Sequence, residues 1–145
     1  ELTPNAIAKA MQHGAFYSTT GVILKKLEFD STRRTLTVVV DEKKGLNYRI
    51  EFIGTHKNAS LKHEDVEAIV DEKGLPHPVT ANYVDERIGM SLKIIDGAKA
   101  VYRMTGDELY VRAVVHCDAP PYFKYDAYSD LVQKAWTQPV GWDGN

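Results

Sequence analysis

The sequence lacks the features that mark several classes of protein. Its single cysteine, Cys117, excludes an internal disulfide and assigns no compartment, because one thiol suits the cytosol, the periplasm or a secreted protein. No apolar run approaches the roughly 18 residues that a membrane-spanning helix needs. The chain also begins, at Glu1, with neither a charged nor an apolar leader segment. We therefore expect a soluble chain with no membrane insertion.

An excess of positive charge is also missing. The chain of 145 residues carries 18 basic and 20 acidic residues, a net charge of −2, and its basic residues form nothing longer than pairs such as Arg33-Arg34. The field that gathers a polyanion is therefore absent, and no nucleic acid is expected as a partner. A hydrophobic fraction of 43% with 26% charged residues is typical of globular proteins, and the length predicts one domain.

Motifs for catalysis and cofactor binding are absent as well. There is no Gly-x-Ser-x-Gly motif, no glycine-rich phosphate loop, and no His-x-His or His-Glu-x-x-His spacing among the five histidines. His116 precedes Cys117, but neighbours on a strand face opposite sides, so no catalytic pair is expected there. A metal held by His56 and His63, or calcium held by acidic pairs at turns, is a weaker alternative. We assign no catalytic residue, metal ligand or cofactor to this chain.

A short helix is predicted near the beginning of the chain. Thr3 suits the N-cap and Pro4 the first turn. Ile7 and Met11, with Ala10 between them, form an apolar stripe at helical spacing. This stripe needs a covering surface, which is a missing neighbouring domain, another protein, a second copy or the rest of this chain.

Alternating apolar and polar residues then predict about eight short strands. This period is typical of antiparallel sheets with one buried face, and crossovers for a parallel sheet are lacking. We predict an all-β fold, an antiparallel β-sandwich of the Ig-like or jelly-roll kind with a short N-terminal helix. Turns at 31–34 and 42–45 would close hairpins of a meander, and residues 55–77 would form an inserted excursion. The predicted strands are 23–29, 36–40, 48–52, 80–84, 90–95, 100–104, 109–117 and one near Trp136, whose ring we expect between the sheets.

Aromatic residues gather in a proline-rich loop between residues 119 and 134. Such rings at the end of a sandwich can stack on a sugar, or they can close the core and hydrogen-bond through their polar tips. A carbohydrate-binding or other ligand-binding sandwich is therefore one candidate function. Its candidate ligand-binding residues are Tyr122, Phe123, Tyr125 and Tyr128, together with Arg112.

Three strings of the sequence carry a resemblance to a known family. They are AIAKAMQHGAFYSTTG at 6–21, TGDELYVRAV at 105–114 and AWTQPVGW at 135–142. In this order they resemble the C-terminal region of bacterial metal-dependent phosphoesterases of the PHP type (polymerase and histidinol phosphatase-like). The resemblance implies that the first string leaves a catalytic barrel and leads into a β-rich accessory domain. The family's metal ligands, which open with a His-x-His motif, match nothing in this chain.

The resemblance implies that the chain has two parts with different roles. Residues 1–20 would be a helix and linker from a missing catalytic barrel, and residues 21–145 the β-sandwich accessory domain. This chain would not be an enzyme, and its divalent metal ions would belong to the barrel of a parent phosphoesterase or hydrolase. The expected partner is that barrel, reached through the N-terminal helix, with a glycan or a phosphorylated small molecule as alternative ligands. Arg112 would pair with Asp107, Glu108 or another carboxylate, or contact an anionic substrate at the barrel.

Overall fold

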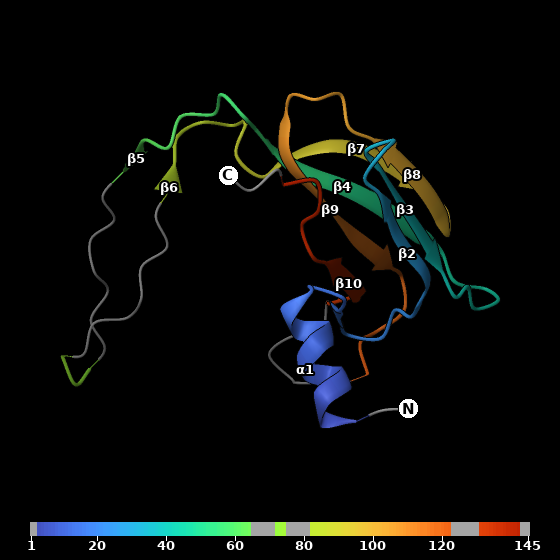
Figure 1. Cartoon of the computed structure of the whole chain (residues 1–145). Coiled ribbons are helices and arrows are strands. Elements are labelled where there is room, and N and C mark those ends of the chain that lie inside the picture. Colours follow the sequence, from blue (N-terminus) through green and yellow to red (C-terminus); the bar gives the residue numbers. More distant parts are fainter. Residues whose placement is uncertain (1–2, 65–71, 75–81, 123–130, 143–145) are drawn as a thin grey trace.

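The computed structural model describes residues 3–64, 72–74, 82–122 and 131–142. Figure 1 shows two packed sheets, a short helix beside one end of them, and a narrow two-stranded arm that reaches away from the body. The predicted all-β sandwich with one short helix is confirmed. In chain order, the elements are α1 (Pro4–Gln12), β1 (Tyr17–Thr19), β2 (Leu24–Asp30), β3 (Thr35–Val40), β4 (Tyr48–His56), β5 (His63–Glu64), β6 (Asn82–Tyr83), β7 (Met90–Asp96), β8 (Lys99–Arg103), β9 (Glu108–Cys117) and β10 (Gln133–Thr137).

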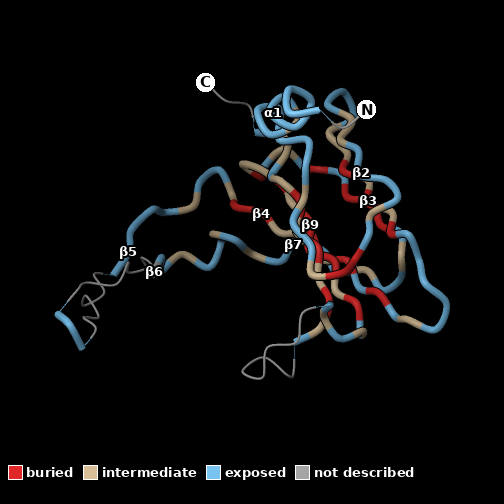
Figure 2. The backbone as a smooth tube through the Cα atoms, turned by 90° about the horizontal axis from the view of Figure 1, so that it is seen from below, coloured by how far each residue is buried: buried red, intermediate tan, exposed pale blue. Residues whose placement is uncertain are grey.

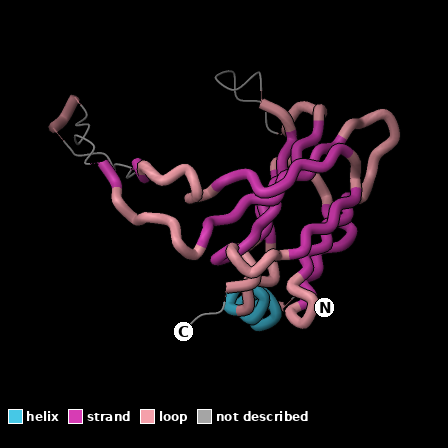
Figure 3. The backbone as a smooth tube through the Cα atoms, turned by 90° about the horizontal axis from the view of Figure 1, so that it is seen from above, coloured by secondary structure: helices cyan, strands magenta, loops and turns pink. Residues whose placement is uncertain are grey.

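Two sheets form the body and a third forms the arm. The larger sheet has five strands in the order β1-β10-β9-β4-β7, the smaller one has the order β2-β3-β8, and β5 pairs with β6 in the arm. Figure 3 shows the arm leaving the body as two adjacent segments. The long ladder between β4 and β9 runs from Tyr48 opposite Cys117 to His56 opposite Glu108. This ladder forms the centre of the larger sheet.

The predicted meander is wrong beyond its first hairpin. Residues 31–34 do join β2 to β3 within one sheet, but residues 42–45 carry the chain from β3 to β4 in the other sheet. The connection from β7 to β8 also changes sheets. At that corner the N–H of Gly97 donates to the carbonyl of Tyr48, and the N–H of Val40 donates to the carbonyl of Ala98, both at 2.8 Å. A period of two fixes which face of a strand is buried but not which strand is its neighbour.

Alternate residues of the strands fill the space between the two sheets. Figure 2 shows the buried residues concentrated in the body, with exposed residues over α1 and much of the arm. The rings of Phe52 and Tyr102 stack across this core with centroids 5.3 Å apart. Burial of one large apolar side chain contributes about 1.5–3 kcal/mol. The largest fully buried side chains are Phe52, Leu36, Ile50, Val38, Val111, Val115 and Cys117.

One aromatic residue predicted for the core lies outside it. Ala135 takes the inward position of β10, whereas Trp136 lies opposite Val114 on the outer face of the five-stranded sheet. The other inward residues of β10 are polar. Gln133 donates to the carbonyl of Pro120 at 2.8 Å, and the hydroxyl of Thr137 accepts from the N–H of Ala113 at 2.8 Å. Because these two inward residues are polar, the sequence pattern does not indicate which face of β10 is buried.

A buried carboxylate closes the corner between β8 and β9. Glu108 is 2% exposed and accepts hydrogen bonds from the hydroxyl of Tyr102 at 2.5 Å, the N–H of Thr105 at 3.0 Å and the N–H of Gly106 at 3.1 Å. Burial by itself raises the pKa of Glu108, but these hydrogen bonds outweigh it and lower the pKa to about 2. The corner is therefore held by a charge that stays ionised inside the protein.

Replacing Glu108 by glutamine tests this corner. We expect E108Q to lower the free energy of unfolding by about 2 kcal/mol at pH 7, because a charged acceptor of several hydrogen bonds is lost. The folded pKa lies below its usual value of 4.5, so the native protein should lose this stability as the pH falls from about 4.5 towards 2. Urea unfolding at pH 7 and pH 3 measures both effects. With D107N as the neighbouring control, equal pH dependence in E108Q and the native protein contradicts this account.

Candidate functional site

The helix α1 forms as predicted, but its apolar stripe is uncovered. The hydroxyl of Thr3 accepts the N–H of Ala6 at 3.2 Å and so caps the helix, and Gly14 leaves it with a positive φ of 65°. No residue of α1 is buried, and Ile7 and Met11 are 46% and 63% exposed. The helix is therefore capped at both ends, yet none of its apolar side chains is fully buried against the part of the chain that the structure describes.

This exposure conflicts with what a helix of nine residues needs. A helix this short is marginal in water by itself and gains most of its stability from packing of an apolar face. The chain continues from α1 into β1, which pairs with β10 at the edge of the five-stranded sheet. The helix is thus tied to the sandwich at its end while the stripe stays open.

Arg112 lies on the outer face of the five-stranded sheet, where β9 places it opposite Ile53 of β4. The predicted ion pair with Glu108 is wrong, because that carboxylate is enclosed in the corner by Tyr102 and Thr105. Within the part of the chain that the structure describes, Arg112 forms no ion pair with Asp107 either. Arg112 is half-buried and remains a candidate contact for an anion.

The predicted aromatic platform is represented by Tyr122 alone. Its ring is 61% exposed, its hydroxyl accepts from the ammonium group of Lys43 at 2.9 Å, and that ammonium lies 5.5 Å from the ring centroid. The hydrogen bond to Tyr122 raises the pKa of Lys43. The other three candidates, Phe123, Tyr125 and Tyr128, lie outside the described residues.

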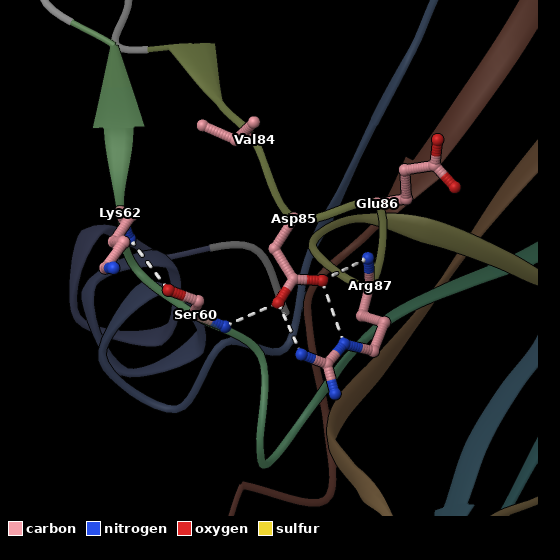
Figure 4. Close-up of a pocket in the computed structure, with 6 residues that line it drawn as sticks. All are labelled: Ser60, Lys62, Val84, Asp85, Glu86 and Arg87. Carbon is pink, nitrogen blue, oxygen red and sulfur yellow. Dashed lines mark hydrogen bonds and ion pairs between the residues drawn. The ribbon is translucent and has the colours of Figure 1, made fainter.

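Asp85 joins the two sides of the arm at its root, as Figure 4 shows. Its carboxylate accepts from the N–H of Ser60 at 2.6 Å, from the N–H of Arg87 at 3.0 Å, and from the guanidinium of Arg87 at 2.9 and 2.6 Å. These bonds, with the guanidinium first among them, hold the pKa of Asp85 well below its usual range. A hollow of about 570 Å³ lies beside this contact and is also lined by Lys62 and Val84.

Sequence reasoning missed this role of Asp85, since an acidic pair at a turn usually faces solvent. Its acceptor positions are occupied by Ser60 and Arg87, so we interpret it as a structural tie of the arm. Ser60 precedes β5 and Asp85 follows β6, and one carboxylate therefore holds both ends of the insertion.

The described residues can also be searched for a metal site, a membrane helix and a catalytic pair. Among them, no group of three or more His, Cys, Asp or Glu side chains is placed to hold a metal ion. The same part of the chain contains no helix with the length and apolar character to cross a membrane. Cys117 is buried while His116 faces the other side of β9, as the alternation predicts. The candidate binding groups of the described residues are therefore the apolar stripe of α1, exposed aromatic rings and arginines.

The three strings that carry the family resemblance lie side by side in the fold. The first contains most of α1 and all of β1, the second most of β9, and the third the end of β10. Tyr17 of β1 is opposite Thr137 of β10, and Trp136 of β10 is opposite Val114 of β9. The strings therefore form one edge of the five-stranded sheet together with the helix that leads into it.

Comparisons of this protein with protein-family models, with curated proteins and with solved structures find no match. Function is therefore inferred from the residues of this chain and their arrangement.

Replacing Asp85 by asparagine tests the tie at the root of the arm. We expect D85N to speed amide hydrogen exchange at Ser60 and Arg87 by about tenfold or more, since local opening no longer breaks charged hydrogen bonds. Global thermal unfolding should change little, because Asp85 lies outside the core. The neighbouring variant E86Q is the matched control. Unchanged exchange at both amides in D85N contradicts the assignment.

Proposed function

We propose that this chain is a non-catalytic accessory domain of a metal-dependent phosphoesterase of the PHP type and that it docks on the catalytic barrel through α1. The observation that carries the proposal is the exposed stripe of Ile7 and Met11 on a helix too short to be stable alone. A neighbouring domain that covers this stripe supplies the packing that the helix lacks. Each large apolar side chain buried in this way contributes about 1.5–3 kcal/mol.

The position of the three strings supports the same proposal. A resemblance confined to scattered turns would say little about a shared architecture. Here the strings build one continuous unit, most of α1 with β1, the end of β10 and most of β9. That unit is the part of the sandwich nearest to a domain that precedes α1 in the chain.

The strand that follows α1, β1, is firmly held on the sandwich, which suits a domain that orients its neighbour. The N–H of Thr20 donates to the carbonyl of Lys134 at 2.9 Å, and the N–H of Lys134 donates to the hydroxyl of Thr20 at 2.8 Å. Thr19 donates to the carbonyl of Val22 at 2.7 Å. At Gly21 a Cβ atom would collide with the side chain of Gln133, so the backbone there approaches β10 closely. These contacts fix β1 on the five-stranded sheet, so a barrel packed on α1 would be joined to the sandwich through an anchored strand.

The coding sequence upstream of Glu1 gives the first test of this proposal. We expect it to encode a barrel with a His-x-His motif and further His and Asp or Glu ligands. An upstream sequence without these positions removes the phosphoesterase assignment. Turnover of phosphoesters by this chain alone, with divalent metal and after rigorous purification, contradicts the non-catalytic role.

Charge placed on the stripe gives the second test. In the protein with its barrel, we expect the double variant I7E/M11K to uncouple the two parts, because charged side chains cannot be buried at the contact without a large cost. Calorimetry should then show two separate unfolding transitions, with a loss of at least about 2 kcal/mol in coupling. Asn5 lies on the opposite side of α1, and N5E is the control that should behave as the native protein. One unchanged transition in the double variant contradicts docking through α1.

A further inference from the structure

A shallow hollow at one end of the five-stranded sheet lies apart from the docking helix. It has a volume of about 300 Å³ and forms where β4 begins and β9 ends. A second hollow of about 300 Å³ adjoins it and shares Asn47, Tyr48 and Asp96. Together they fall within the size range of small-molecule sites, about 300–1,000 Å³. The polar residues that line the first hollow include Asn47, Arg49, Asp96, His116 and Asp118.

Strand register brings three of these side chains into one row. Arg49 of β4 is opposite His116 of β9 on one side and opposite Asp96 of β7 on the other. Lys134 of β10 extends the row beyond His116. Neighbouring strands lie about 4.8 Å apart, so the backbone positions of Arg49, His116 and Asp96 span roughly 10 Å. The row follows the end of the sheet across β10, β9, β4 and β7, whose order can be traced in Figure 1.

The charges of this row are not neutralised by one another. Within the described residues, neither Arg49 nor Lys134 forms an ion pair or a side-chain hydrogen bond, and the carboxylate of Asp96 accepts no hydrogen bond. Arg49 and Asp96 are directly opposite and both exposed, yet they remain apart. The guanidinium of Arg49 and the carboxylate of Asp96 therefore line one hollow, and both are available to a ligand.

His116 occupies the middle of the row in its neutral form. Burial lowers its pKa, and the charges of Lys134 and Arg49 lower it further, against the opposing effect of Glu51, whose carboxylate lies 3.6 Å from Nε2. The imidazole therefore adds no charge at neutral pH. The cations Arg49 and Lys134 stand among the carboxylates of Glu51 and Asp96, so an incoming anionic group is held by its direct contact with Arg49 and not by an excess of positive charge.

The wall of the hollow is fixed by a second pair. The N–H and the side-chain amide of Asn47 donate to the two carboxylate oxygens of Asp118 at 3.0 and 2.7 Å. These bonds, the side-chain one first, lower the pKa of Asp118. Each oxygen of Asp118 already accepts one hydrogen bond, whereas Asp96 accepts none with its carboxylate among the described residues and is the freer acceptor of this hollow.

We propose that this hollow binds a small hydroxy-carboxylate of the sugar-acid class, with Arg49 holding the carboxylate and Asp96 accepting a hydroxyl hydrogen. The planar guanidinium matches a carboxylate through two parallel hydrogen bonds. A carboxylate such as that of Asp96 is an acceptor for hydroxyl groups. A neutral sugar leaves the Arg49 fork unused, and inorganic phosphate carries more negative charge at neutral pH than a single carboxylate, so Asp96 repels it more strongly.

Calorimetric titration of the whole chain with glucuronate, glucose and inorganic phosphate tests the site. We expect glucuronate to bind, and glucose and phosphate to bind at least about tenfold more weakly, because glucose has no carboxylate for Arg49 and Asp96 repels the higher charge of phosphate. R49Q and D96N should each weaken glucuronate binding by about tenfold or more. Arg103 lies on the other sheet, and R103Q is the matched control that should bind as the native chain does.

Three results overturn the proposal. They are glucose or phosphate binding as tightly as glucuronate, glucuronate binding that survives R49Q, and no binding of any of the three compounds. Thermal unfolding of each variant confirms that the sandwich is intact before titration. The docking stripe lies elsewhere, so I7E/M11K should keep glucuronate binding, and failure of one proposal leaves the other standing.

Discussion

The pairing of β4 with β9 is the constraint on which the rest of the structure depends. Its register places Ile50 opposite Val115 in the core and, one residue earlier on β4, Arg49 opposite His116 on the outer face. A slip of one residue would exchange these two faces and put the charged pair between the sheets. Burial of the core therefore fixes the surface row as well. The proposed ligand site follows from the same register that stabilises the fold.

Much of the fold follows from local pattern, and the parts that do not have identifiable causes. The strands appear where alternation is strong, and α1 begins where Thr3 and Pro4 predict it. The exchange of sheets after β3 was not predictable, because polar turn residues look the same whether the next strand pairs beside them or crosses over. The buried face of β10 could not be predicted, because Gln133 is a polar residue that faces inward. The burial of Glu108 could not be predicted from hydropathy, because a charged residue is expected at the surface. Its carboxylate is buried because the N–H groups of Thr105 and Gly106, in the turn after β8, donate hydrogen bonds to it.

The candidate sites were predictable to different degrees. The stripe of α1 is local, so spacing alone identified it, but only the three-dimensional structure shows that the sandwich leaves it open. The position of Arg112 on a strand predicts that its side chain projects from the sheet. Its lack of a carboxylate partner within the described residues was not predictable, because the carboxylate of Glu108 is bound to the hydroxyl of Tyr102 in the corner instead. The row of Arg49, His116 and Asp96 was missed entirely. Its members come from three distant strands, and no spacing along the chain indicates that they meet.

We propose that the apolar face of α1, which the described residues leave exposed, is covered when a catalytic barrel precedes it. Oxidation of methionine by hydrogen peroxide measures this directly, because Met11 lies on that face at 63% exposure while Met104 is 5% exposed in the core. We predict rapid oxidation of Met11 in this chain alone and strong protection of Met11 in the protein with its barrel. Met104 should be protected in both. Equal oxidation of Met11 in the two proteins would contradict the account.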